Sequence, residues 1–131
     1  MHRMNTQERL YAVRGAVCCR NEEASIGELV PELYRRLLKN NSIDEARIVS
    51  VLFTVTADLT RMNPATALRK AGLAESAPLF AALEPAIDGS LAGVVRVLIT
   101  YYGSSEPVPV YFNGAEALRP DLFPRTGPKA D

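Results

Sequence analysis

Three arginines interrupt stretches of apolar, strand-like sequence, and they are the first candidates for chemistry. Arg14 lies in AVRGAV, Arg96 in VVRVLI and Arg119 in ALRPD. A charge in a buried strand costs free energy unless it is paired or meets a ligand. Each arginine alone is explained by a place on the polar face of its strand, or by a pair with Asp or Glu. Three together favour an anion site, because a planar guanidinium donates two parallel hydrogen bonds to a carboxylate.

Four further polar residues stand in informative surroundings, and each also has a purely structural explanation. Glu84, in ALEPAI, fits a solvated carboxylate at a strand end, and Tyr111, in VPVYF, fits a half-buried aromatic with a bonded hydroxyl. Asn63 fits a helix cap, and Arg69 fits an exposed helix residue. These residues by themselves predict a soluble domain with a candidate anion site.

The residue types that are scarce in the chain narrow the chemistry. The one histidine is His2, so a Ser-His-Asp triad or a histidine-based metal site is not expected. Cys18 and Cys19 are adjacent, and neighbours in a strand point to opposite faces, so they predict no disulfide framework. Any enzyme chemistry must therefore rest on Arg, Glu, Tyr and backbone groups.

Length and composition indicate one globular domain. The chain has 131 residues, of which 47% are hydrophobic and 23% charged. Fifteen basic and 15 acidic residues give no net charge, which argues against nucleic-acid binding and favours association with partner subunits. No apolar stretch could span a bilayer, and the polar start MHRMNTQERL lacks a signal core. We therefore expect a cytoplasmic protein.

The elements that must hold these residues begin with a strand and a long helix. Residues 10–19 are apolar or small and predict a strand. Asn21 and the acidic residues after it predict a helix start, and Pro31 is expected to kink the helix or to mark where its regular part begins. One helix face is predicted from the apolar spacing of Ile26, Leu29, Val30, Leu33 and Leu37.

The middle of the chain predicts a second strand and a short helix. Ser42 and Glu45 have the spacing of a capping box for a short helical turn. Residues 48–56, IVSVLFTVT, predict a central buried strand. Asn63 as cap and Pro64 at the first position predict a helix that ends near Lys70.

Three more strands are expected over residues 77–83, 94–102 and 108–112. The fold class is therefore α+β (mixed α/β), a single mixed sheet with one long and one short helix on one face. We expect a flexible leader over residues 1–9, one domain over 10–122, and a mobile tail over 123–131.

A set of short motifs, taken in order, resembles the monofunctional, trimeric chorismate mutases. The motifs are VRGAV (13–17), TADL (56–59), NPATALR (63–69), EPAIDGSL (84–91), VVRVLIT (94–100), VYF (110–112) and ALRPDL (117–122). The resemblance implies an isomerase of phenylalanine and tyrosine biosynthesis, in the shikimate pathway, that rearranges chorismate to prephenate. It also implies a homotrimeric pseudo-α/β barrel with each site between two subunits, and no cofactor.

The resemblance assigns roles residue by residue. Arg14 would bind a substrate carboxylate, and Tyr111 would hydrogen-bond the same region. Arg96 would reach the ether oxygen whose bond breaks, and Glu84 would contact the ring hydroxyl side. The neighbouring chain would line the pocket through Asn63, Ala65, Leu79, Phe80 and Ala81, and the pocket would be closed by Arg69, Leu118 and Arg119.

This chemistry suits the residues available. The rearrangement is pericyclic and needs no nucleophile, metal or proton shuttle. Holding the dianionic substrate folded removes its conformational freedom in advance. Negative charge grows on the ether oxygen in the transition state, where a fixed guanidinium binds it better than in the ground state.

The chain departs from the family pattern at four positions of the pocket. Thr66 replaces a lysine, Phe80 and Ala81 replace small polar residues, and Asn63 stands where an aromatic can occur. These departures bear on affinity and on the pocket entrance. Two alternatives stay open: a fold-related trimeric imine deaminase with water as nucleophile, and a non-catalytic trimer that binds an aromatic-pathway metabolite.

Overall fold

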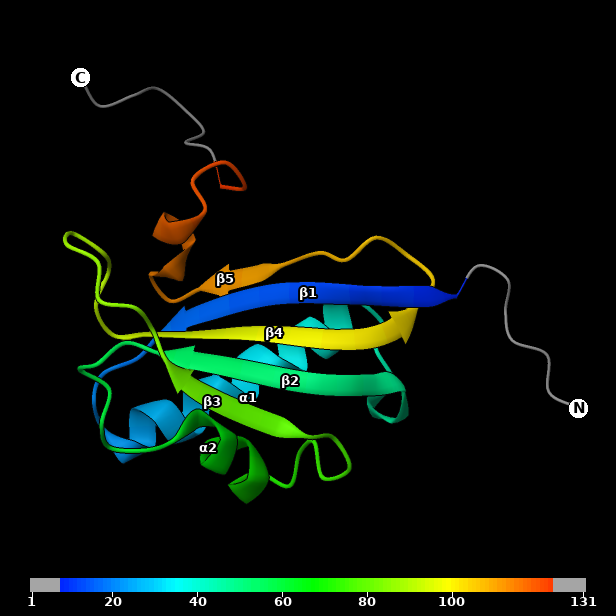
Figure 1. Ribbon diagram of the computed structural model, residues 1–131, viewed down its shortest axis with the longest axis horizontal. Coiled ribbons are helices and arrows are strands. Elements are labelled where there is room, and N and C mark those ends of the chain that lie inside the picture. Colours follow the sequence, from blue (N-terminus) through cyan, green and yellow to red (C-terminus); the bar gives the residue numbers. More distant parts are fainter. Residues whose placement is uncertain (1–7, 124–131) are drawn as a thin grey trace, which may run out of the picture.

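The computed structural model describes residues 8–123 as one five-stranded sheet with two helices (Figure 1). The strands are β1 (Arg9–Cys18), β2 (Ile48–Val55), β3 (Leu79–Leu83), β4 (Val94–Gly103) and β5 (Val110–Phe112). The helices are α1 (Glu23–Asn40) and α2 (Pro64–Lys70), with short 3₁₀ turns η1 (Glu45–Arg47) and η2 (Ala115–Leu118). The predicted α+β class is confirmed, and both helices lie on one side of the sheet.

The sheet is mixed and has β4 at its centre. The strand order is β3-β2-β4-β1-β5, and β4 runs antiparallel to both β1 and β2. The edge strands β3 and β5 run parallel to β2 and β1, respectively. Helix α2 makes the crossover between the parallel strands β2 and β3, as parallel neighbours require.

The core lies between α1 and the inner face of the sheet. The fully buried residues Leu33 and Leu37 of α1 belong to the same apolar cluster as Val97 of β4. Gly15 permits this packing, because a Cβ there would lie 2.9 Å from Leu37 Cδ1 and 2.9 Å from the carbonyl oxygen of Val110. Strand β1 can therefore approach α1 and β5 closely while Arg14 faces away from the core.

The prediction that 48–56 is a central strand is confirmed in that β2 is internal, paired with β3 on one side and β4 on the other, whereas the predicted burial is wrong. Only alternate residues of β2, such as Val51 and Phe53, are buried. Leu52, between them, is 42% exposed. Because β2 has apolar residues on both faces, its sequence does not show the alternation of apolar and polar residues that is typical of a sheet covered by helices on one side only.

The predicted start of α2 is confirmed. Helix α1 begins at Glu23, within two residues of the predicted start, but Asn21 does not cap it. Asn63 Oδ1 accepts a hydrogen bond from the Ala65 amide at 2.8 Å. The N-cap of α1 is Glu22, which makes no side-chain cap hydrogen bond. Asn21 Oδ1 instead accepts from the amides of Thr60 and Arg61, so its side chain holds a loop distant in sequence. Helix α1 itself continues through Pro31.

The predicted capping box of Ser42 and Glu45 is also wrong. Asp44 caps η1 by accepting from the Ala46 amide at 3.0 Å. The Glu45 carboxylate accepts from the Tyr34 hydroxyl and from the Ala74 amide instead. The capping-box spacing considers only nearby residues, whereas the Glu45 carboxylate accepts its hydrogen bonds from residues distant in the sequence.

The expected division into a leader, a domain and a tail stays a prediction. Strand β1 begins at Arg9, and Glu8 forms an ion pair with Arg47. The remaining expectations for the leader and the tail fall on residues 1–7 and 124–131, outside the described residues. Within residues 8–123, no helix is both long enough and apolar enough to cross a membrane.

Candidate functional site

The face of the sheet opposite the helices carries its side chains in rows that run across the strands. One row joins Leu52 of β2, Leu98 of β4 and Arg14 of β1, which lie directly opposite one another. The next row joins Thr54, Arg96 and Ala16 in the same way and ends at Tyr111 of β5. Alternation along each strand thus turns Arg14 and Arg96 to the same face, one row apart.

These rows form a hollow of about 340 Å³, which we call the arginine pocket. Its size falls in the range of small-molecule sites. Four residues predicted from the sequence, Arg14, Arg96, Tyr111 and Arg119, contribute to its wall. The complete lining is Arg14, Gly15, Leu52, Thr54, Arg96, Val97, Leu98, Tyr111 and Arg119. Three guanidinium groups around one hollow suit a ligand with more than one negative charge.

Glu84, just after β3, lines a neighbouring hollow of about 310 Å³, and its side chain contacts two residues of the arginine pocket. Its amide donates to the Val55 carbonyl at 2.8 Å, which continues the pairing of β3 with β2 by one residue. Its carboxylate accepts from the Thr54 hydroxyl, and Oε1 lies 3.3 Å from Nε of Arg96. The carboxylate therefore offsets part of the charge that Arg96 brings into an apolar strand.

The segment after η2 brings Arg119 to the rim of the arginine pocket. The Arg119 guanidinium donates to both carboxylate oxygens of Asp121, at 3.1 and 2.9 Å. These hydrogen bonds lower the pKa of Asp121. The guanidinium carbon lies 6.0 Å from the centre of the Tyr111 ring, and the Phe123 ring meets the same ring edge-on, with the ring centres 6.3 Å apart. Leu118 packs on the small cluster of buried residues that includes Tyr111.

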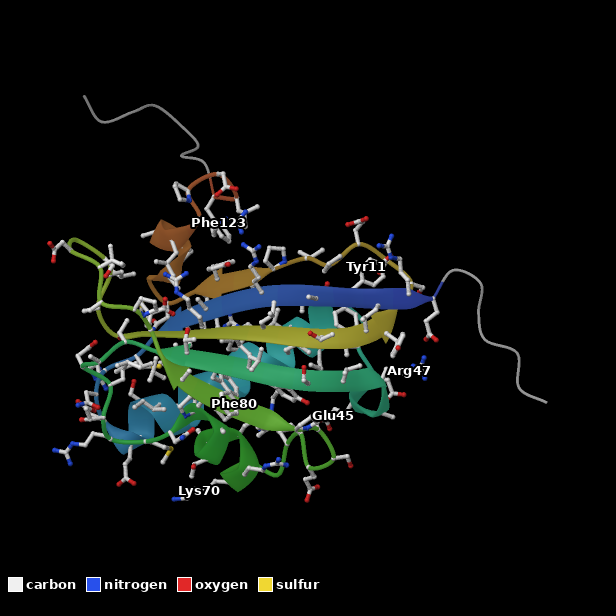
Figure 2. All side chains as sticks on the ribbon, in the orientation of Figure 1. Tyr11, Glu45, Arg47, Lys70, Phe80 and Phe123 are labelled. Atoms are coloured by element: carbon white, nitrogen blue, oxygen red, sulfur yellow. The ribbon has the colours of Figure 1, made fainter. Side chains whose placement is uncertain are left out.

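The residues expected from a neighbouring chain lie elsewhere, on α2 and β3. Asn63 and Ala81 line a separate hollow of about 320 Å³, which we call the β3 hollow. Ala65 and Leu79 are partly buried and pack on the main core. Phe80 is 66% exposed on the open face, opposite Leu52 in register (Figure 2). One chain therefore presents two separate surfaces, the arginine pocket and the β3 hollow.

The Arg69 side chain lies in neither surface. Its guanidinium donates to the carbonyl oxygens of Ala74, Glu75 and Ala77 at 2.6, 3.0 and 3.1 Å. It therefore holds the loop that leads from α2 into β3.

Residues that line the arginine pocket but were not predicted from the sequence include Thr54, Leu52 and Leu98. Thr54 lies in an apolar run and is uncharged, so the sequence alone does not mark it as a site residue. The signal that identifies it is the strand register, because Thr54 lies directly opposite Arg96.

The sequence of the chain is similar to those of known chorismate mutases. The family model for chorismate mutase type I matches residues 10–122. The chorismate mutase AroH of Thermus thermophilus is 36% identical over 116 residues, which cover 84% of this chain and 93% of that protein. The chorismate mutase AroH of Bacillus subtilis strain 168 is 28% identical over 117 residues, which cover 84% and 90%.

A solved structure points the same way. A chorismate mutase from Clostridium thermocellum matches with a TM-score of 0.77 and 32% sequence identity, over 82% of this chain and 98% of that one. The residues that match the family model include those that line the arginine pocket. The chain therefore belongs to the type I chorismate mutase family.

Proposed function

We propose that the chain rearranges chorismate to prephenate in the arginine pocket. Membership of the family supports the reaction, and the pocket supports the place. The observation that carries the proposal is that Arg14, Arg96 and Arg119 surround one small hollow on the open face of the sheet. A dianionic substrate needs such a set of fixed cations, because a neutral pocket would not repay the loss of its hydration.

The roles of the residues follow from charge and position. Arg14 and Arg119 bind the carboxylates, and Tyr111 donates a hydrogen bond beside them. Arg96 faces the ether oxygen, where negative charge grows as the carbon–oxygen bond breaks. Glu84 accepts from the ring hydroxyl. The protein forms no bond to the substrate, and it acts by holding the folded conformer and stabilising the charge that develops.

The working form is a homotrimer in which each site lies between two chains. Two observations support this assembly. The open face of the sheet exposes large apolar side chains, including Leu52 and Phe80, which association would bury. The β3 hollow, with Asn63 and Ala81 in its wall, is separate from the arginine pocket in one chain, so a neighbour can supply it. Ala65, Leu79 and Phe80 belong to that contribution. Leu118 helps to close the site from beside Tyr111, and Arg69 contributes indirectly, by holding the loop that leads into β3.

The test is direct. Purified protein is mixed with chorismate without added cofactor, and prephenate is identified by nuclear magnetic resonance. Saturable conversion that depends on Arg96 is the expected result. Binding of chorismate without turnover would favour the non-catalytic trimer instead. Hydrolysis of an imine substrate, with chorismate untouched, would favour the deaminase.

A further inference from the structure

We propose that Thr54 is a positioning residue, whose hydroxyl holds the Glu84 carboxylate against Arg96 in the orientation that the reaction needs. This inference rests on the proposed function and deepens it. Thr54 would not touch the reacting atoms. It would act through Glu84, which would touch both the substrate and Arg96.

The sheet places Thr54 between the two charged partners. Thr54 is in β2, Arg96 is directly opposite it in β4, and Glu84 follows the last residue of β3 on the other side of β2. Neighbouring strands lie about 4.8 Å apart, so the Glu84 side chain must cross the width of β2 to reach Arg96. The residue at position 54 is therefore beneath the carboxylate.

The hydrogen-bond pattern shows what Thr54 does there. Its hydroxyl donates to Oε1 of Glu84, and the same oxygen lies 3.3 Å from Arg96 Nε. Oε2 of Glu84 has no hydrogen-bond partner among residues 8–123, so it can accept from a hydroxyl of the substrate. The protein therefore holds Oε1 of Glu84, and Oε2 is left for the ligand.

The ion pair by itself does not fix this geometry. Nε of Arg96 is buried, and within the described chain it makes no hydrogen bond of good geometry despite the nearby carboxylate. An attraction between charges has little directional preference, whereas a hydroxyl donor to a carboxylate does. The directional contact to Glu84 therefore comes from Thr54, and a free carboxylate could rotate away from Arg96.

Size also selects threonine at this position. Thr54 lines the arginine pocket, where a larger side chain would take up ligand space or block the path of Glu84. Valine has the same shape and suits a strand equally well, but it cannot donate a hydrogen bond. Thr54→Val therefore removes the positioning contact and little else.

The experiment compares Thr54→Val with Thr54→Ser, which keeps the hydroxyl. Thr100→Val is the matched control, because Thr100 lies in β4 on the same face, two rows away, and makes no side-chain hydrogen bond within residues 8–123. A hydrogen bond to a charged group contributes enough that kcat for chorismate should fall about ten- to a hundredfold in Thr54→Val. Thr54→Ser should stay within about threefold of the parent, and Thr100→Val should match it.

A double-mutant cycle separates positioning from a general structural effect. In a Glu84→Ala background, Thr54→Val should cost less than about twofold in kcat, because the side chain that it positions has already been removed. Equal losses in both backgrounds, or equal losses in Thr54→Val and Thr54→Ser, would overturn the proposal. Melting temperatures of all variants show that folded protein is being compared.

A crystal structure of Thr54→Val tests the same inference without activity. The proposal expects Glu84 Oε1 to move from Arg96 Nε to beyond 4 Å of separation, about the limit of an ion pair. An unchanged carboxylate would refute it. Failure of the parent protein to convert chorismate would instead refute the proposed function, so the two failures are distinguishable.

Discussion

Arg96 shows at the scale of one residue how a costly placement can serve function. It interrupts the central strand β4, and among residues 8–123 the carboxylate that forms an ion pair with it is that of Glu84, at 3.3 Å. A side chain whose sole task was stability would be better replaced by an apolar one. Under the proposed function, its place in the arginine pocket supplies the reason for a charge at this position.

Arg96→Ala should lower turnover of chorismate sharply in a protein that still folds. Removing one preorganised donor to a developing negative charge typically costs about 3–4 kcal/mol, or roughly a hundred- to a thousandfold in rate. Arg96→Lys should recover little, because the ammonium lacks the planar fork. Steady-state kinetics and thermal melting are measured together. A well-folded variant with near-normal turnover would mean that Arg96 is not at the reacting oxygen.

The two cysteines should react slowly with alkylating reagents in the native protein. Burial, and next the neighbouring Cys18, raise the pKa of the Cys19 thiol to about 12, and burial also raises that of Cys18. At pH 8 roughly one Cys19 in ten thousand would be thiolate, the reactive form. Mass spectrometry after iodoacetamide treatment should show Cys19 unmodified until denaturant is added. Native labelling at the rate of a free thiol would contradict its burial.

At the scale of elements, side chains from distant segments hold the loops that lead into the site. Asn21 binds the amides of Thr60 and Arg61, just before α2. Asn41 accepts from the Val108 amide at 2.6 Å and donates to its carbonyl at 2.9 Å, two residues before β5. These hydrogen bonds hold loops whose movement would displace predicted site residues, Asn63 after the first loop and Tyr111 after the second.

Arg69→Ala should loosen the loop that joins α2 to β3. The variant loses hydrogen bonds to three carbonyl groups, and a loss of about 1–2 kcal/mol in the free energy of unfolding is expected at fixed protein concentration. Hydrogen exchange should quicken over residues 72–78, and the KM for chorismate should rise because Leu79 and Ala81 follow the loop. Lys70→Ala is the control, since Lys70 is exposed on the same helix (Figure 2). Unchanged exchange would show that the loop is held by other contacts.

At the scale of the whole molecule, one chain leaves an apolar sheet face open. The helices cover only the inner face, and Leu52 and Phe80 stay exposed on the other. A face of this kind, beside a charged pocket, is what a subunit boundary buries.

Sedimentation equilibrium at micromolar concentration should give three times the chain mass of 14.3 kDa. Phe80→Glu should dissociate the assembly, because the interface would then bury an unpaired carboxylate. Lys70→Glu, on the helix-covered side of the molecule, should leave the assembly intact. A fully active monomer would contradict a site shared between chains.

The sequence by itself determined the elements whose signals are local. Asn63 and Pro64 set the start of α2, because a side-chain cap and a fixed φ act within one turn. Runs of apolar, mostly β-branched residues predicted β2 and β4, because such residues favour strands. Arg14 and Arg96 were identifiable as candidates because a charge within such a run is costly wherever the strand lies.

Only the tertiary structure decided which of these residues meet. The contact of Glu84 with Thr54 and Arg96 joins three strands, and it depends on register and on the face to which each side chain points. A shift of one residue in pairing would turn Arg96 into the core, although the local sequence would be unchanged. For the same reason Asn21 and Glu45, which resemble helix caps locally, accept hydrogen bonds from distant amides, because the tertiary fold brings those unpaired amides within reach.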